Sequence, residues 1–250
     1  YQYHTSKGKT GIFYEEKNDT YVEINDDIYF LKDKQRFILS SEKNGFRHLY
    51  LYDTSGNEIK PITSGNWEVD HLYGINEKDN MVYFTSSETG PAERQFYAMN
   101  IKDCSKKQLT NEPGIHAIET SPGLEYYVDQ HSSAGIPPTF KLYALKNNKL
   151  QTVLENNEDL VNTLANYNLS KIEFTKIPAA DGQAMEGFVI KPPSFDSRKQ
   201  YPVLLFVYGG PGHQNVLNQW GGANYLWFQM LAAKGYIIVS IDNRGSGGKG

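Results

Sequence analysis

The chain has 250 residues, of which 39% are hydrophobic and 22% are charged, as is usual for a globular protein. Its net charge is −4 and it has no basic stripe, so nucleic acid is not an expected partner. No apolar run approaches the roughly 20 residues that a membrane-spanning helix needs. The single cysteine, Cys104, excludes an internal disulfide, which suits a cytoplasmic protein and equally an envelope protein that folds without disulfides.

The first two thirds of the chain repeat a pattern of short strands separated by turn residues. The predicted strands are 36–41, 46–52 and 58–62, then 80–87, 94–100 and 107–110, and in a looser third copy 125–128, 139–145 and 150–154. Tyr50, Tyr97 and Tyr143 mark corresponding points about 46 residues apart. With a further strand beginning near Trp67 or Ile115, this period of four strands is typical of β-propeller blades.

Three blades do not close a ring, because propellers have roughly four to eight. The open ends of such an arc would expose unpaired strand edges. The chain also begins with Tyr1 rather than with Met. Either the chain pairs with separate pieces or it is part of a longer protein, and we expect the second, with the remainder of the same polypeptide as its structural partner.

The character of the sequence changes after Glu155. Apolar residues at helical spacing between Asp159 and Tyr167 predict a short helix. The alternating segments 171–177 and 184–191 predict a hairpin with Asp181-Gly182 at its turn. We place a domain boundary here, with propeller blades over residues 1–158 and a linker plus the start of a second domain over residues 159–250.

The C-terminal segment predicts a strand–helix–strand unit. The apolar run 202–207 is what a central strand covered on both faces requires, and 236–241 predicts a second buried strand. Between them, residues 223–234 are helix-like and end at Gly235. This order favours a parallel strand pair.

A glycine-rich loop, Tyr208-Gly-Gly-Pro-Gly212, follows the first of these strands. Glycines let a backbone pass close to a reacting carbonyl, and a phenol held there can donate a hydrogen bond to a developing oxyanion. The alternative is a tight turn at the end of a strand, with a tyrosine that belongs to the core.

Several segments resemble the dipeptidyl peptidase IV branch of the prolyl oligopeptidase superfamily. They are residues 41–50, 62–69, 201–212 and 242–250, and they follow one another along the chain in the same order as in the family. Tyr208 stands where many relatives outside the branch have His. The resemblance implies the last blades of a β-propeller followed by the N-terminal part of an α/β-hydrolase domain.

The resemblance also implies a serine exopeptidase that releases N-terminal dipeptides, Xaa-Pro or Xaa-Ala, from peptide substrates. Tyr208 matches the family's oxyanion-hole tyrosine, and Gln214 matches a position near the substrate cleft. The nucleophile would lie in a G-x-S-x-G motif, followed by Asp and His. The chain contains no such motif, and Ser246 lacks the required glycine spacing. We expect the triad beyond residue 250 and this chain alone to be inactive.

Some residues imitate site residues. Glu15-Glu16 is similar to the family's amine-binding Glu pair, but that pair lies well upstream of the blades matched here, and we interpret these residues as the solvated edge of a strand over 20–24. Residues 23–26 lack the Phe-Arg that the family often has, so contacts beyond the scissile bond are expected to differ. His213 precedes any nucleophile, whereas the fold places its His last, which favours a solvent-facing loop residue.

Two other functions stay open. One is a non-catalytic relative that uses the same fold as a binding scaffold, and retention of Tyr208 argues against it. The other is a related oligopeptidase or acylaminoacyl-peptidase, against which the Tyr in place of His argues. The six histidines show no ligand spacing, so neither a metal nor a cofactor is expected. The family further implies a periplasmic, cell-envelope or secreted location and a homodimer.

Overall fold

The computed structural model describes residues 2–4, 8–19, 21–23 and 27–250. The chain forms two compact units. The first comprises Tyr1–Glu88, Phe96–Thr110 and Lys249–Gly250, and the second comprises Thr89–Gln95 and Asn111–Gly248. None of the helices in the described residues is long and apolar enough to span a membrane.

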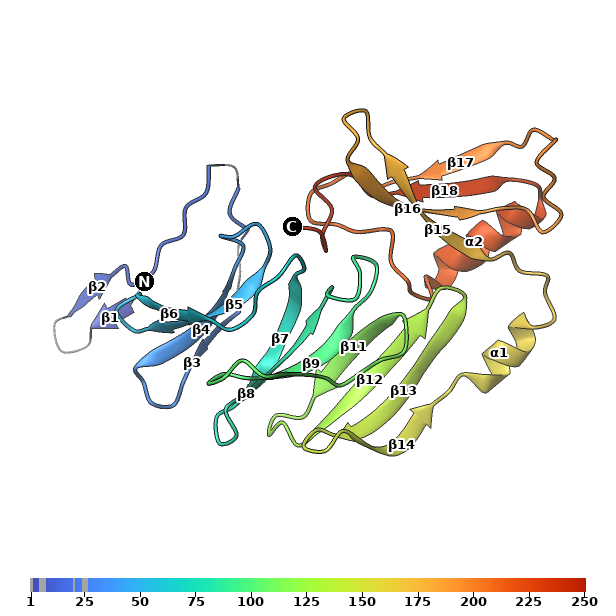
Figure 1. The fold of residues 1–250 in the computed structure, drawn as a ribbon. Helices are drawn as coiled ribbons and strands as arrows, with labels where there is room; N and C mark the ends of the chain where they lie inside the picture. Colours follow the sequence, from blue (N-terminus) through green and yellow to red (C-terminus); the bar gives the residue numbers. More distant parts are fainter. Residues whose placement is uncertain (1, 5–7, 20, 24–26) are drawn as a thin grey trace. The chain divides into compact units, whose positions relative to one another are not determined.

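Within the described residues, three antiparallel sheets of four strands follow one another along the chain (Figure 1). The first contains β3 (Ile28–Phe30), β4 (Arg36–Ser41), β5 (His48–Asp53) and β6 (Glu58–Pro61). The second contains β7 (Val69–Asn76), β8 (Met81–Ser86), β9 (Gln95–Asn100) and β10 (Lys106–Gln108). The third contains β11 (Ile115–Thr120), β12 (Tyr126–Ser133), β13 (Ile136–Ala144) and β14 (Lys149–Glu155). Each sheet keeps its strands in sequence order, as propeller blades do, which confirms the predicted repeat.

The middle strands of the first two sheets are buried on both faces. In β5, Leu49 and Leu51 join an apolar cluster that also contains Trp67 and Phe84. Tyr50 and Tyr52 point to the other face, where they pack with Phe37. The third copy is looser, since Tyr143 is half-buried whereas Tyr50 and Tyr97 are almost fully buried.

The segment before the first sheet, which follows the short pair β1 (Gln2–His4) and β2 (Lys9–Gly11), corrects one prediction. Glu15 is exposed, as expected, but Glu16 is half-buried and accepts hydrogen bonds from the hydroxyls of Ser41 at 2.7 Å and Tyr14 at 2.9 Å. Residues 21–23 are not in a strand, and residues 20 and 24–26 lie outside the described part of the chain. Glu16 is therefore held against the first sheet rather than solvated at a strand edge.

The remaining elements belong to the second unit. They are α1 (Glu158–Leu164), β15 (Ile172–Pro178), β16 (Ala184–Ile190), β17 (Val203–Phe206), α2 (Gly222–Ala233) and β18 (Ile237–Ile241). The four strands form a sheet in the order β15-β16-β18-β17, in which β17 and β18 are parallel, as predicted. Helix α2 lies along this sheet (Figure 1) and packs Phe228 and Ala232 against Phe188, Ile190 and Ile238.

Among the described residues, β17 stands at the edge of this sheet and only one of its faces is covered, by α2, so its expected central position stays a prediction. Leu204 and Phe206 face α2, whereas Val203 and Leu205 on the other face are 59% and 56% exposed. The apolar run predicted the strand correctly, but a run of this kind does not say what covers each face. The domain boundary at residue 158 stays a prediction.

Each of the first two sheets has an ion pair at the same place, but the positions of the positive and the negative residue are exchanged between them. Lys43, two residues after β4, pairs with Glu58, which opens β6, while its ammonium lies 3.9 Å from the centre of the Tyr50 ring. At the matching points of the second sheet, Glu88 pairs with Lys106, whose ammonium lies 5.3 Å from the centre of the Tyr97 ring. The repeat therefore keeps the pair and its aromatic support but exchanges the charges.

We predict that exchanging both charges of the Glu88–Lys106 pair restores most of the stability that a change of one charge removes. Lys106→Glu alone should lower the free energy of unfolding by about 1 kcal/mol, because it places two carboxylates together and removes the ring contact. Adding Glu88→Lys should recover more than half of that loss in urea unfolding. Lys107→Glu, an exposed neighbour, serves as the control and should change little. A double variant whose loss equals the sum of the two single losses would contradict the pairing.

We also predict a histidine contribution to stability that depends on pH. His48 is buried; the Gly65 carbonyl accepts from Nε2 and the Thr63 hydroxyl lies 3.0 Å from Nδ1. Burial lowers the pKa of His48 below 6.5, because the charged ring loses water. Below pH 6.5 the unfolded chain therefore takes up this proton more readily than the folded one, so the free energy of unfolding should fall as the pH falls. His48→Gln should flatten the dependence between pH 7 and 5 in chemical denaturation, and an identical slope in that variant would refute the prediction.

Candidate functional site

The glycine loop leaves the carboxyl end of β17 and presents Tyr208 to solvent. Tyr208 is 66% exposed among the described residues, so it does not belong to the core that they form. Gly209 and Gly212 have φ angles of 78° and 70°, a left-handed conformation that favours glycine. The Tyr208 ring lies over Gly210, where an added Cβ would be only 2.3 Å from its Cε1 atom. A role of the hydroxyl in an oxyanion hole stays a prediction.

The segment after β18 contacts this loop at three points. The carboxylate of Asp242 accepts the backbone N–H groups of Asn215 at 2.9 Å and Val216 at 3.0 Å. The Asn243 side chain donates to the carbonyl of Gly209 at 2.7 Å. The N–H of Gly212 donates to the carbonyl of Gly245, also at 2.7 Å. The parallel pair brings both carboxyl ends to one edge of the sheet, which is why the two loops meet.

Gln214 is half-buried, and its amide bonds within the protein. Its Oε1 accepts from the Arg94 guanidinium at 2.8 Å, and its Nε2 donates to the carbonyls of Pro91 at 2.7 Å and Val216 at 3.2 Å. Arg94 lies 120 residues away in the sequence, and no local signal predicts this contact. The structure places Gln214 six residues beyond Tyr208 in the same loop, and its assignment to a substrate cleft stays a prediction.

The end of the loop is tied to the third sheet through Asn218. Its side-chain nitrogen donates to Glu93 at 2.8 Å, and its side-chain oxygen accepts the N–H of Ala134, also at 2.8 Å. Glu93 in turn accepts the N–H of Gly114. The loop is thus supported by residues 91–94 and by the β12–β13 turn, and all of these residues belong to the second unit.

Other candidates for chemistry have structural partners. His213 is exposed, as predicted, with its ring centre 4.4 Å from that of Tyr208 and its Nε2 3.3 Å from Asn215 Oδ1. Ser246 is buried and its hydroxyl donates to the carbonyl of Asn243 at 3.0 Å. Arg244 pairs with Asp181 at 2.7 Å; the pKa of Asp181 is lowered first by the N–H of Gln183 and then by this charge.

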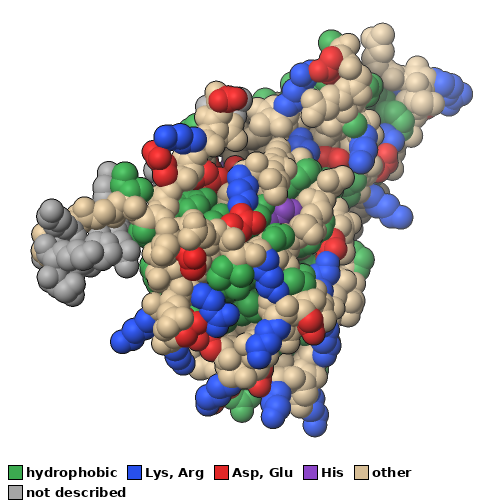
Figure 2. Space-filling model, turned by 60° about the vertical axis from the view of Figure 1, so that its left-hand side comes forward, with side chains coloured by type: hydrophobic (Ala, Val, Ile, Leu, Met, Phe, Trp, Pro, Cys, Tyr) green, Lys and Arg blue, Asp and Glu red, His purple; other side chains and the backbone are tan. Residues whose placement is uncertain are grey.

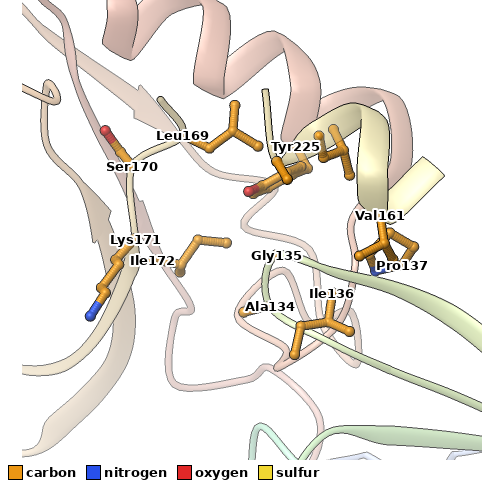
Figure 3. Close-up of a pocket in the computed structure, with 12 residues that line it drawn as sticks. Ala134, Gly135, Ile136, Pro137, Val161, Leu169, Ser170, Lys171, Ile172 and Tyr225 are labelled. Carbon is orange, nitrogen blue, oxygen red and sulfur yellow. The ribbon is translucent and has the colours of Figure 1, made fainter. Parts of the chain in front are cut away.

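Two cavities lie in the second unit, and Tyr208 lines neither. The larger, of about 500 Å³, is bounded by the β12–β13 turn, α1, the chain leading to β15, and Tyr225 (Figure 3). Tyr225 is buried, which raises its pKa, and its hydroxyl is turned toward the turn at Gly135, whereas Lys171 points away from the cavity. The smaller, of about 250 Å³, lies beneath the loop, between Gln214 and Phe206. The larger cavity is lined mostly by apolar residues, whereas the smaller is lined by polar side chains as well, including His213 and Gln214.

The described residues contain no group of three or more His, Cys, Asp and Glu side chains arranged to hold a metal ion. On the face shown in Figure 2, Lys and Arg side chains are interspersed with Asp and Glu.

Comparisons with known proteins agree on one family. The family model described as the dipeptidyl peptidase IV (DPP IV) N-terminal region matches residues 1–138. The crystal structure of Porphyromonas gingivalis dipeptidyl peptidase 4 is similar with a TM-score of 0.89 and 32% identity, over 99% of this chain and 35% of that one.

Curated relatives give the same result over most of the chain. The dipeptidyl peptidase 4 proteins of Arthroderma otae and Trichophyton rubrum are each 30% identical to it over 222 residues, which is 87% of this chain. The chain spans only 28% of the length of each of these two relatives. The family model matches more than half of the chain, and the similar structure covers nearly all of it. The chain therefore belongs to the dipeptidyl peptidase IV family.

Proposed function

We propose that this chain is part of a serine-type dipeptidyl peptidase that releases N-terminal Xaa-Pro or Xaa-Ala dipeptides from peptides. The observation that carries the proposal is the exposed phenol of Tyr208, held on a glycine loop at the carboxyl end of a parallel strand. A hydroxyl in that place can donate to the oxyanion of a tetrahedral intermediate, together with a backbone N–H that follows the nucleophile.

The sheet of β15–β18 supports assigning residues 159–250 to the N-terminal part of an α/β-hydrolase domain. Among the described residues, only one face of this sheet is covered by a helix, α2. On its other face Val203, Leu205 and Val207 are each more than half exposed. Sheets with parallel strands are usually covered on both faces, so further helices of such a domain would bury this surface.

In this proposal the nucleophilic Ser, the Asp and the His lie beyond residue 250, and the chain by itself is catalytically inactive. The absence of a G-x-S-x-G motif from the sequence supports this, and the buried, bonded hydroxyl of Ser246 supports it as well. Gln214 would shape the cleft by holding the loop, because its amide atoms are engaged by Arg94 and Pro91. An envelope or secreted location and a homodimer stay predictions.

Replacing the phenol tests the proposal directly. In the longer protein that carries this chain, Tyr208→Phe should lower kcat for a Gly-Pro chromogenic substrate about 10²–10³-fold, because one oxyanion donor is lost. KM and the free energy of unfolding should change little, since the ring is exposed. Tyr236→Phe, at the opposite end of β18, is the matched control. Unchanged kcat in Tyr208→Phe would remove the role of the hydroxyl, and an unmodified longer protein without hydrolysis would favour a binding scaffold.

Moving the phenol without removing it should have a similar effect. Gly210→Ala places a methyl group where the Tyr208 ring lies, and the ring must swing aside. We expect kcat to fall at least about tenfold, because a misplacement of about 1 Å is costly to catalysis. A crystal structure should show the ring displaced over an unchanged loop backbone. Gly123→Ala, whose Cβ would meet only the Glu125 side chain at 3.6 Å, is the control; an unmoved ring would contradict the prediction.

A further inference from the structure

The Tyr208 loop, which comprises residues 207–218 after β17, depends on hydrogen bonds from other segments for its conformation. Two of its residues, Gly209 and Gly212, adopt left-handed φ angles, and glycine is the residue with the greatest backbone freedom. A loop of this composition has many competing conformations, so a fixed position for the neighbouring phenol requires contacts that select one of them.

Asp242 supplies the most buried of these contacts. Its side chain is 3% exposed, and its two carboxylate oxygens accept from consecutive backbone N–H groups, those of Asn215 and Val216. Hydrogen bonds to an ionised acceptor are roughly twice as strong as neutral ones. The carboxylate therefore fixes the far end of the loop.

The other contacts come from residues on either side of Asp242. Asn243 donates to the carbonyl of Gly209, next to Tyr208, and the carbonyl of Gly245 accepts from Gly212 in the middle of the loop. The hydroxyl of Ser240 donates to the carbonyl of Phe206 at 2.8 Å, which holds the β17–β18 register just before the two loops begin. The loop is thus held at its start, middle and end by one short segment.

We propose that Asp242 and Asn243 are positioning residues, which hold the Tyr208 loop so that the phenol lies where an oxyanion develops. The inference rests on the proposed function of Tyr208 and extends it to residues that do not touch the substrate. Asp242 acts through Asn215 and Val216 at one end of the loop, and Asn243 acts through Gly209 at the other. Loss of either contact frees the loop while leaving every reacting group present.

Two variants separate positioning from folding. Asp242→Asn keeps the shape of the side chain, but its NH₂ group faces one of the two N–H groups, so one hydrogen bond becomes a contact between donors. Asn243→Ala removes the bond to Gly209, from a half-buried residue, and keeps the test informative if Asp242→Asn is poorly folded. Asp181→Asn, which changes an exposed carboxylate bonded to Arg244 and not to the loop, is the matched control.

The experiment is a double-mutant cycle with Tyr208→Phe in the longer protein, using a Gly-Pro chromogenic substrate. Asp242→Asn should lower kcat about 10²-fold and Asn243→Ala about tenfold, with KM within about twofold, since misplacing a stabilising donor costs transition-state binding. In the Tyr208→Phe background the same changes should cost less than about threefold, because the group that they position is gone. Hydrogen exchange at the amides of Asn215 and Val216 should also accelerate in Asp242→Asn.

Each outcome has one meaning. Equal losses of kcat in both backgrounds would show that Asp242 and Asn243 act by another route and would overturn the inference, as would unchanged exchange at both amides. An unchanged kcat in Tyr208→Phe itself would overturn the proposed function instead. A loss of activity in Asp181→Asn as large as that in Asp242→Asn would mean that any lost carboxylate in this region has the same effect, and would also overturn the inference.

Discussion

The parallel pairing of β17 with β18 is the constraint on which the rest of the site depends. The register Phe206↔Ser240 places the residues that follow each strand at one edge of the sheet. Tyr208 and its glycines follow one strand, and Asp242 with Asn243 follows the other, so a loop without regular structure acquires hydrogen-bond partners at once. The site is therefore a product of strand order, and the glycines are tolerable because a neighbouring segment fixes them.

The first two propeller-type sheets are stabilised by interactions that recur at the same positions in both copies. Their repeat preserves places rather than residues: Tyr50 and Tyr97 match, while the ion pair beside them exchanges its charges. What the sheet requires at that place is a cation over a ring and an anion within reach, and either strand position can supply either charge. Sequence comparison between the copies shows the tyrosines but hides the pair.

The sequence predicted the strands of the first two sheets well because alternating apolar residues and turn residues mark both the interior and the ends of each strand. It predicted the β17–α2–β18 unit for the same reason. It did not find Arg94 beside Gln214, because that contact follows from packing between distant segments. The Asp242 segment was visible as part of a family resemblance, yet its hydrogen bonds became apparent only with the register of the sheet.

The segment Thr89–Gln95, which joins β8 to β9 and includes the first residue of β9, belongs with the second unit, and Lys249 belongs with the first. The backbone consequently passes from one unit to the other after residues 88, 95, 110 and 248, which makes four crossings. A single cut by a protease leaves the two units joined by covalent bonds, whichever peptide bond is broken. The two units are thus joined by four chain connections rather than by one linker, and neither is a continuous stretch of sequence.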